Sequence, residues 1–107
     1  MGKERSRPAQ LDRDGLQLVF RKLFSLRVLP LSSVKRVGAI PLPSLVDEIG
    51  LMFENQSGEL MHIRETDKGF RWLAGQFEID RLLGDDWYGR AKRGEYLWAD
   101  VTANPFA

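Results

Sequence analysis

The residue types that catalysis and metal binding most often use are scarce in this chain. Its 107 residues include no cysteine and a single histidine, His62. Without cysteine there is no thiol nucleophile, thiolate metal ligand or disulfide, and one imidazole cannot build a multi-histidine metal centre. A serine triad would need His62 as its base. Because His62 alternates with Met61 and Ile63, we expect it on the polar, solvent-facing side of a strand.

The one compact group of carboxylates in the sequence is Asp80, Asp85 and Asp86. Paired carboxylates can share a proton or bind Mg²⁺ through their oxygens. Two adjacent aspartates are equally typical of a helix N-terminus, where they accept hydrogen bonds from free N–H groups. The sequence also lacks G-x-S-x-G, a Gly-rich phosphate loop and H-E-x-x-H. We therefore expect helix capping at Asp85 and Asp86, and we predict no enzymatic activity, no cofactor and no metal site.

Aromatic residues concentrate in the last third of the chain, close to several cations. Trp, Tyr and Arg dominate the energetics of protein interfaces. The same residues could stack on the bases of a single-stranded nucleic acid, or bury a helix against a sheet. Trp72 is the best single candidate for a contact, because it lies on a predicted helix away from the apolar stripe. The candidate partner-binding residues are Arg71, Trp72, Trp87, Tyr88, Tyr96 and Trp98.

The net charge of +1 hides two unlike halves. Residues 1–36 carry nine Lys/Arg and three Asp/Glu, a net +6, whereas residues 37–107 carry seven and twelve, a net −5. This asymmetry indicates a basic surface for nucleic acid or anionic lipid, a pairing surface between protomers, or two halves that neutralise each other. The alternative anionic-ligand site is a basic rim that would hold a phosphate or a lipid headgroup. Its residues are Arg21, Lys22, Lys35 and Arg36.

Length and composition indicate one folded domain. A hydrophobic fraction of 43% with 10% aromatic residues is too high for a disordered chain. Residues 1–13 are predicted to be a flexible basic arm, and residues 14–107 a single α+β domain. No apolar stretch approaches the roughly 18–20 residues that span a bilayer, and no apolar segment follows the charged N-terminus. We expect a cytoplasmic protein.

Alternating apolar residues predict strands over 16–20 and 24–28, with Arg21 and Lys22 at the turn between them. Val34–Val37 is predicted to be a short strand or a single helical turn. The segment 39–44 contains Pro41 and Pro43, which favour an extended edge or a loop.

The clearest local pattern is a β-hairpin. Ile49, Leu51 and Phe53 alternate with polar or small residues, and a second alternating run covers residues 60–64. Asn55-Gln56-Ser57-Gly58-Glu59 between them is rich in turn formers.

After Glu65 the apolar period becomes helical. Phe70, Leu73, Ala74 and Phe77 share one face, which predicts one or two helices over 67–83, capped by Thr66 or Asp67. A shorter helix is predicted over 87–93, and an extended segment over 96–98. Strands followed by helices predict an α+β fold: an antiparallel sheet of about four to six strands with a C-terminal helix packed on one face.

The order of these elements resembles a family of short bacterial proteins with a pleckstrin-homology-like layout. The likeness covers about residues 32–90. It depends on an E-x-x-x-G-F-x-x-L helix start and a D-x-W-Y segment, matched by Glu65, Gly69, Phe70, Leu73, Asp85, Trp87 and Tyr88. The resemblance implies a partial pleckstrin-homology-like roll, a scaffold for peptide or lipid-headgroup binding, and no enzymatic activity.

The function expected from the sequence is that of a small non-enzymatic protein-interaction module. Its partner would be another protein or a second copy of the chain, and an immunity- or inhibitor-type role is one concrete form. The alternative is an anionic-ligand binder that uses the basic rim for a lipid headgroup or nucleic acid.

Overall fold

The computed structural model describes residues 6–43 and 47–107. Its strands are β1 (Arg7–Pro8), β2 (Gln10–Leu11), β3 (Gln17–Lys22), β4 (Ser25–Pro30), β5 (Val34–Leu42), β6 (Glu48–Asn55), β7 (Leu60–Arg64) and β8 (Leu97–Asp100). Its helices are α1 (Phe70–Gln76), α2 (Ile79–Leu83) and α3 (Trp87–Lys92), and a short 3₁₀ turn, η1 (Leu31–Ser33), joins β4 to β5. None of these helices has the length and apolar character needed to cross a bilayer.

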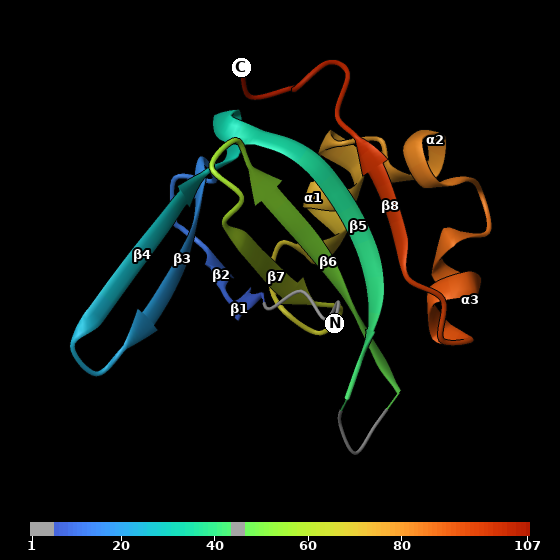
Figure 1. The fold of residues 1–107 in the computed structure, drawn as a ribbon, viewed down its shortest axis with the longest axis horizontal. Helices are drawn as coiled ribbons and strands as arrows, with labels where there is room; N and C mark the ends of the chain where they lie inside the picture. Colours follow the sequence, from blue (N-terminus) through green and yellow to red (C-terminus); the bar gives the residue numbers. More distant parts are fainter. Residues whose placement is uncertain (1–5, 44–46) are drawn as a thin grey trace.

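Five strands form the main sheet in the order β1-β7-β6-β5-β8. All neighbours are antiparallel except β1 and β7, which run parallel. The helices gather at one side of this sheet, where α3 contacts β5 and β6 and α2 contacts β8 (Figure 1). Both the α+β class and the C-terminal helix packed on the sheet are confirmed.

The core lies between the helices and one face of the main sheet. Inward-facing residues of the strands alternate along the chain, as in Val37 of β5 and Phe53 of β6, and are completely buried. The ring of Phe53 packs against Phe77, with centroids 5.5 Å apart. Phe70 at the start of α1 packs against Trp87 of α3. Apolar burial of this kind is the main favourable contribution to folding.

The hairpin predicted over residues 49–64 is confirmed. β6 and β7 pair from Gly50 opposite Arg64 to Glu54 opposite Leu60. Gly58 in the turn has a φ of 89°, a left-handed conformation that favours glycine.

Two helices, α1 and α2, form within the segment 67–83. Glu78, which separates them, has a φ of 52°. A residue in the left-handed conformation cannot continue a right-handed helix, so the helix is interrupted at Glu78. The apolar stripe of the sequence nevertheless runs from α1 into α2. The helical period alone does not reveal such a break.

The predicted caps at Thr66 and Asp67 are wrong. The Thr66 hydroxyl donates to Glu48 at 2.8 Å, and the Asp67 carboxylate accepts the backbone N–H of Arg64 at 2.9 Å. Both side chains therefore order the turn after β7, and α1 begins only at Phe70.

Strand β5 contains the two segments for which the sequence allowed more than one structure, residues 34–37 and most of residues 39–44. It runs through Val34–Val37 and continues past Pro41 as the strand between β6 and β8. β8 pairs with β5 only from Arg36 to Ala39. Pro41 thus lies where β5 has a neighbour on one side, the kind of position that tolerates proline. The end of the predicted segment, at residue 44, lies outside the described residues.

The first residues of the expected basic arm, 1–5, lie outside the described residues, and the next ones are in strands. Pro8 in β1 pairs with His62 of β7, and the N–H of Ala9 donates to the His62 carbonyl at 2.8 Å. Arg7 lies 3.5 Å from Glu59 in an ion pair. The structure thus attaches residues 7–11 to both sheets.

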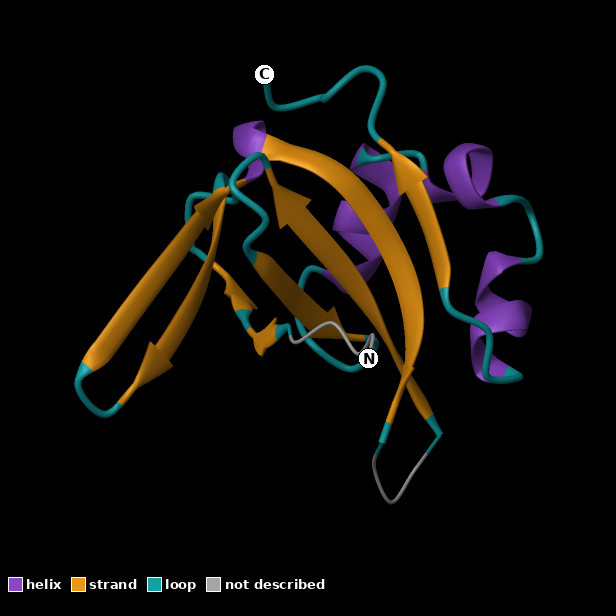
Figure 2. Cartoon of the chain, in the orientation of Figure 1, coloured by secondary structure: helices purple, strands orange, loops and turns teal. Residues whose placement is uncertain are grey.

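A second sheet of β2, β3 and β4 supports a long hairpin. At its base Leu18 lies opposite Leu29, and both are completely buried in the main core. β2 pairs with β3 only at Leu18 and Val19. Beyond Val19, β3 and β4 pair only with each other, and they extend away from the main sheet and the helices (Figures 1 and 2). Residues 20–27 are called the projecting hairpin below.

The turn predicted at Arg21 and Lys22 is wrong. Both residues are in β3, opposite Leu26 and Ser25, and the turn is formed by Leu23 and Phe24. Tight hairpin turns select Gly, Asn or Asp. Because the turn contains none of these, its residue types gave no signal of its position.

We predict opposite effects of alanine at two glycines. A Cβ on Gly38 would lie 2.6 Å from the carbonyl oxygen of Leu97 and 2.8 Å from Cε3 of Trp98, whereas one on Gly75 in α1 would meet nothing within 4 Å. Gly38→Ala should therefore lower the free energy of unfolding by about 1–3 kcal/mol. Gly75→Ala should raise it by about 0.5–1 kcal/mol through helix propensity.

Urea unfolding of both variants, followed by circular dichroism, measures these changes. A Gly38→Ala variant as stable as the parent would show that β5 and β8 are not packed as closely as described.

Candidate functional site

The six candidate partner-binding residues do not all line one groove. Arg71, Trp87 and Tyr88 line the same groove between α1 and α3. Trp72 lines a different groove, beside Gly15. Trp98 lies in β8, and Tyr96 directly precedes that strand. Three of the six are therefore brought together.

Trp87 is a core residue. It is buried against Phe70, and its indole Nε1–H donates to the Asp80 carboxylate at 2.5 Å. A buried indole usually needs such an acceptor. The Asp80 carboxylate is therefore used within the fold.

Tyr88 is tied into a network that holds α3 against the end of the main sheet. Its hydroxyl donates to Glu65 Oε2 at 2.5 Å, and Lys92 Nζ lies 2.8 Å from Glu65 Oε1. The backbone N–H of Ile49 also donates to Glu65, and Lys92 donates to the carbonyl of Asp47. One carboxylate thus joins α3, the start of β6 and the loop after β7.

This network changes the pKa of its members. Burial alone would raise the pKa of the Glu65 carboxyl, but hydrogen bonds from Lys92, Tyr88 and Ile49 outweigh it, and the pKa is lowered. The hydrogen bond to Glu65 raises the pKa of the Tyr88 phenol and that of the Lys92 ammonium. Glu65 was not selected as a site residue. Its sequence signals were its place after the predicted strand and at the start of the E-x-x-x-G-F-x-x-L pattern.

Trp98 is half-buried under an arginine. The guanidinium of Arg36 lies 4.5 Å from the indole ring centre, and its Nε is 2.5 Å from Glu54 Oε1. Gly38 beside the ring leaves room for the indole to lie on β5. Arg36 and Trp98 therefore stabilise the outer face of the main sheet together.

Trp72 and Tyr96 are exposed, as are Arg71 and Tyr88. Trp72 is 44% exposed and packs edge-on against Phe106. Tyr96 is 65% exposed. They come from α1 and from the loop before β8.

The four cations of the expected basic rim are also separated. Arg21 and Lys22 are at the far end of β3, whereas Lys35 and Arg36 are at the start of β5, beyond all of β4. The six residues of β4 span about 20 Å at the usual rise of a strand. One phosphate cannot contact both pairs.

His62 is half-buried rather than fully solvent-facing. Its Nδ1 lies 2.6 Å from the Ser6 hydroxyl, and burial lowers the pKa of its imidazole. Together with the backbone bond from Ala9, this contact attaches the segment at Ser6 to β7.

The expected side-chain cap at Asp85 and Asp86 is wrong, because α3 begins without a side-chain cap hydrogen bond. Asp86 precedes α3 without a side-chain cap, and its carboxylate lies 3.0 Å from Arg93 instead. Within residues 6–43 and 47–107, no group of three His, Asp or Glu side chains is arranged to hold a metal ion.

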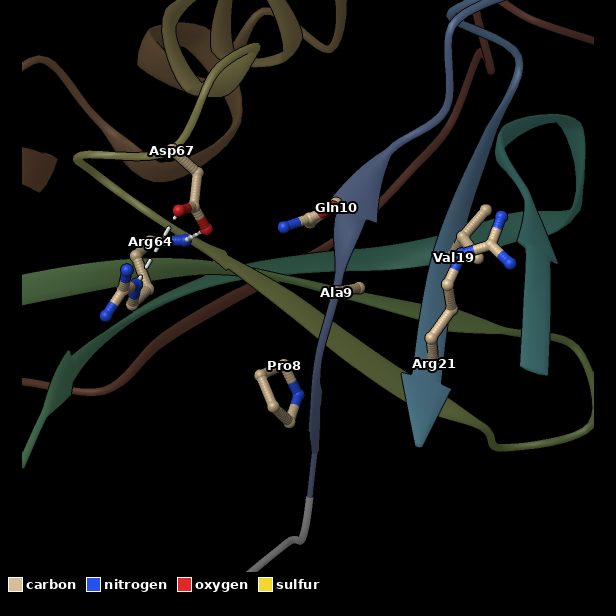
Figure 3. A pocket seen from close by; sticks show the side chains of 7 residues that line it. All are labelled: Pro8, Ala9, Gln10, Val19, Arg21, Arg64 and Asp67. Atoms are coloured by element: carbon tan, nitrogen blue, oxygen red, sulfur yellow. Dashed lines mark hydrogen bonds and ion pairs between the residues drawn. The ribbon is translucent and has the colours of Figure 1, made fainter. Parts of the chain in front are cut away.

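The groove beside β1 and β2 contains two arginines that do not converge. Figure 3 shows Arg64 bonded to Asp67 on one side of the Pro8–Gln10 segment, and Arg21 on the other side. Arg64 Nε lies 3.6 Å from Asp67. The groove therefore does not present paired cations to an anion.

The projecting hairpin holds the most exposed apolar groups of the described residues. Leu23 is 85% exposed and Phe24 94%, and Leu26 on β4 is 57% exposed. Arg21 lies opposite Leu26, and Lys22 and Arg27 are also exposed. From the sequence, Arg21 and Lys22 were expected at a turn and in a basic rim, and Phe24 and Leu26 in a strand, whereas Leu23 was assigned to no element. The sequence does place two large apolar residues, Leu23 and Phe24, between cations, but their types do not mark them as a turn.

The Glu65 network generates a pH prediction. The pKa of Glu65 is lower in the folded than in the unfolded chain, so its stabilisation is present above the ordinary value of about 4.5 and is lost as the pH falls through the folded value. Glu65→Gln should lower the free energy of unfolding by about 1–3 kcal/mol at pH 7. Thermal unfolding of both proteins from pH 7 to pH 3 should show the difference shrinking.

Glu78→Gln is the matched control. Its partner Arg81 is 2.6 Å away, but both side chains are exposed, so the substitution should cost less than about 1 kcal/mol. A Glu65→Gln difference that stays constant down to pH 3 would contradict an ionic role for this carboxylate.

Comparison with known proteins identifies no relative of this chain. The chain matches no protein-family model, no curated protein and no solved structure. Its function is therefore inferred from the groups that the described residues leave exposed.

Proposed function

We propose that the protein is a non-enzymatic interaction module and that the projecting hairpin is its contact element. The observation that carries this proposal is the exposure of Leu23 and Phe24 at a turn. Gly, Asn or Asp would suit the turn better, and neither side chain is buried in the fold. Their presence is explained by a partner that buries them.

The hairpin also limits the chemistry of the partner. The sequence from residue 15 to residue 46 contains no Asp or Glu. Within the projecting hairpin the charges are Arg21, Lys22 and Arg27. A suitable partner is negatively charged and can surround two large apolar side chains.

The aromatic residues favour this surface over the one expected from the sequence. Trp87, Tyr88 and Trp98 form contacts within the fold. Removing them would weaken the packing of α3 and β8 together with any binding. An immunity- or inhibitor-type role through these residues has less support than contact through the hairpin.

The substitutions that test this proposal should leave the fold intact. Because both side chains are exposed, Leu23→Ser/Phe24→Ser should change the free energy of unfolding by no more than about 0.5 kcal/mol. Leu29→Ala, at the buried base of the same hairpin, should lower it by about 2–5 kcal/mol. Urea unfolding measures both, and a large loss in the double variant would mean that Leu23 and Phe24 serve the fold.

Contact by the hairpin can be trapped directly. A photo-crosslinking aromatic residue in place of Phe24 should form adducts in intact cells, and the same residue in place of exposed Tyr96 should form far fewer. The Arg21→Gln/Lys22→Gln/Arg27→Gln variant should suppress the adducts at position 24. Equal labelling at both positions, or none at position 24, would refute the hairpin as the contact element.

A further inference from the structure

The dimensions of the projecting hairpin match those of a lipid–water interface. Leu23 and Phe24 form its end, and Arg21 and Arg27 lie two and three residues behind them along the strands. Lys22 lies directly next to Leu23. At about 3.3 Å per residue the two arginines are roughly 7–10 Å behind the apolar end. This is about the depth to which apolar groups enter the boundary between headgroups and acyl chains.

We infer, on the basis of the proposed function, that the partner of the projecting hairpin is the surface of a bilayer that contains anionic lipids. Leu23 and Phe24 enter the outer acyl region, and Arg21, Lys22 and Arg27 contact the phosphates.

The pairing of the strands limits how deep the hairpin goes. β4 is the edge strand of its sheet, so one row of its N–H and C=O groups has no strand partner. Unpaired backbone groups are not tolerated in the hydrocarbon core but can bind water and headgroups at the interface. The hairpin therefore enters with its turn and leaves the strands among the headgroups.

The positive charge of the projecting hairpin favours anionic over neutral lipids. Each Lys or Arg near an anionic surface strengthens binding about fivefold. Three cations in the hairpin, without an acidic residue from 15 to 46, give about a hundredfold preference for anionic over neutral lipid. The same charges disfavour a second copy as the partner, because two hairpins side by side would bring their cations together.

Vesicle sedimentation tests the inference. Wild-type protein should sediment with vesicles of phosphatidylcholine and phosphatidylglycerol, and only weakly with phosphatidylcholine alone. Leu23→Ser/Phe24→Ser should reduce binding at least about tenfold, because two apolar side chains no longer enter the bilayer. Arg21→Gln/Lys22→Gln/Arg27→Gln should reduce it about a hundredfold.

The matched control removes three exposed cations elsewhere. Arg13→Gln/Lys68→Gln/Arg93→Gln makes the same change in net charge outside the hairpin. It should reduce binding much less, since long-range attraction is screened over about 10 Å at 0.1 M salt. Equal losses in the two triple variants would overturn the inference, because net charge alone would then explain binding.

The absence of cysteine allows a direct measure of insertion. Ser25→Cys places a single label on the tip, and Thr102→Cys places one near the C-terminus. An environment-sensitive fluorophore should shift to the blue at position 25 when anionic vesicles are added, and stay unchanged at position 102. No shift at position 25 would overturn insertion.

The two proposals fail in different ways. One outcome is that wild-type protein fails to bind anionic vesicles while the crosslinker at position 24 captures a protein. That result would overturn the bilayer as the partner and would support the projecting hairpin as the contact element. If neither vesicle binding nor crosslinking occurs, both proposals are overturned. Lipid adducts at position 24 together with vesicle binding support both.

Discussion

The pairing of Leu18 with Leu29 is the contact on which the exposed part of the molecule depends. Both side chains are completely buried, and each contributes about 1.5–3 kcal/mol on removal from water. Because side chains alternate along a strand, a slip of one residue would turn them out of the core. The pair therefore fixes the register of β3 and β4. Beyond this pair, Phe20 packs against the core, and residues 21–27 follow at fixed positions outside it.

Outside the projecting hairpin, several charged and aromatic side chains are used in contacts within the fold. The Glu65 carboxylate joins α3 to the sheet, Arg36 covers Trp98, and Asp80 accepts the indole of Trp87. These contacts use many of the aromatic and charged side chains that a binding surface would need. Within the described residues, the projecting hairpin contacts the rest of the fold through Phe20, which packs against the main core and lies under the Arg7 guanidinium. Leu23 and Phe24 at its turn are 85% and 94% exposed. The exposed side chains of the projecting hairpin are consequently available for contact with a partner.

Local patterns predicted much of the fold and little of the site. Alternation identified the β6–β7 hairpin, and the helical period identified the α1–α2 segment, because both patterns depend on residues close in sequence. The break at Glu78 and the turn at Leu23 and Phe24 depend on backbone conformation that these residue types do not signal. Lys35 and Arg21 were grouped from charge alone, and the length of β4 separates them. Which aromatic residues are buried is decided by packing between distant segments, which one sequence does not reveal.

Hydrogen exchange followed by mass spectrometry tests the central claim most directly, because it reports on every segment of the unmodified protein at once. In the absence of lipid, amides of residues 20–27 should exchange fast, since an isolated pair of strands is marginally stable. Vesicles with phosphatidylglycerol should slow exchange in that segment and leave α1, α3 and β8 unchanged. Protection that appears around Arg71, Trp72 and Tyr88 instead, or in no segment, would contradict the account.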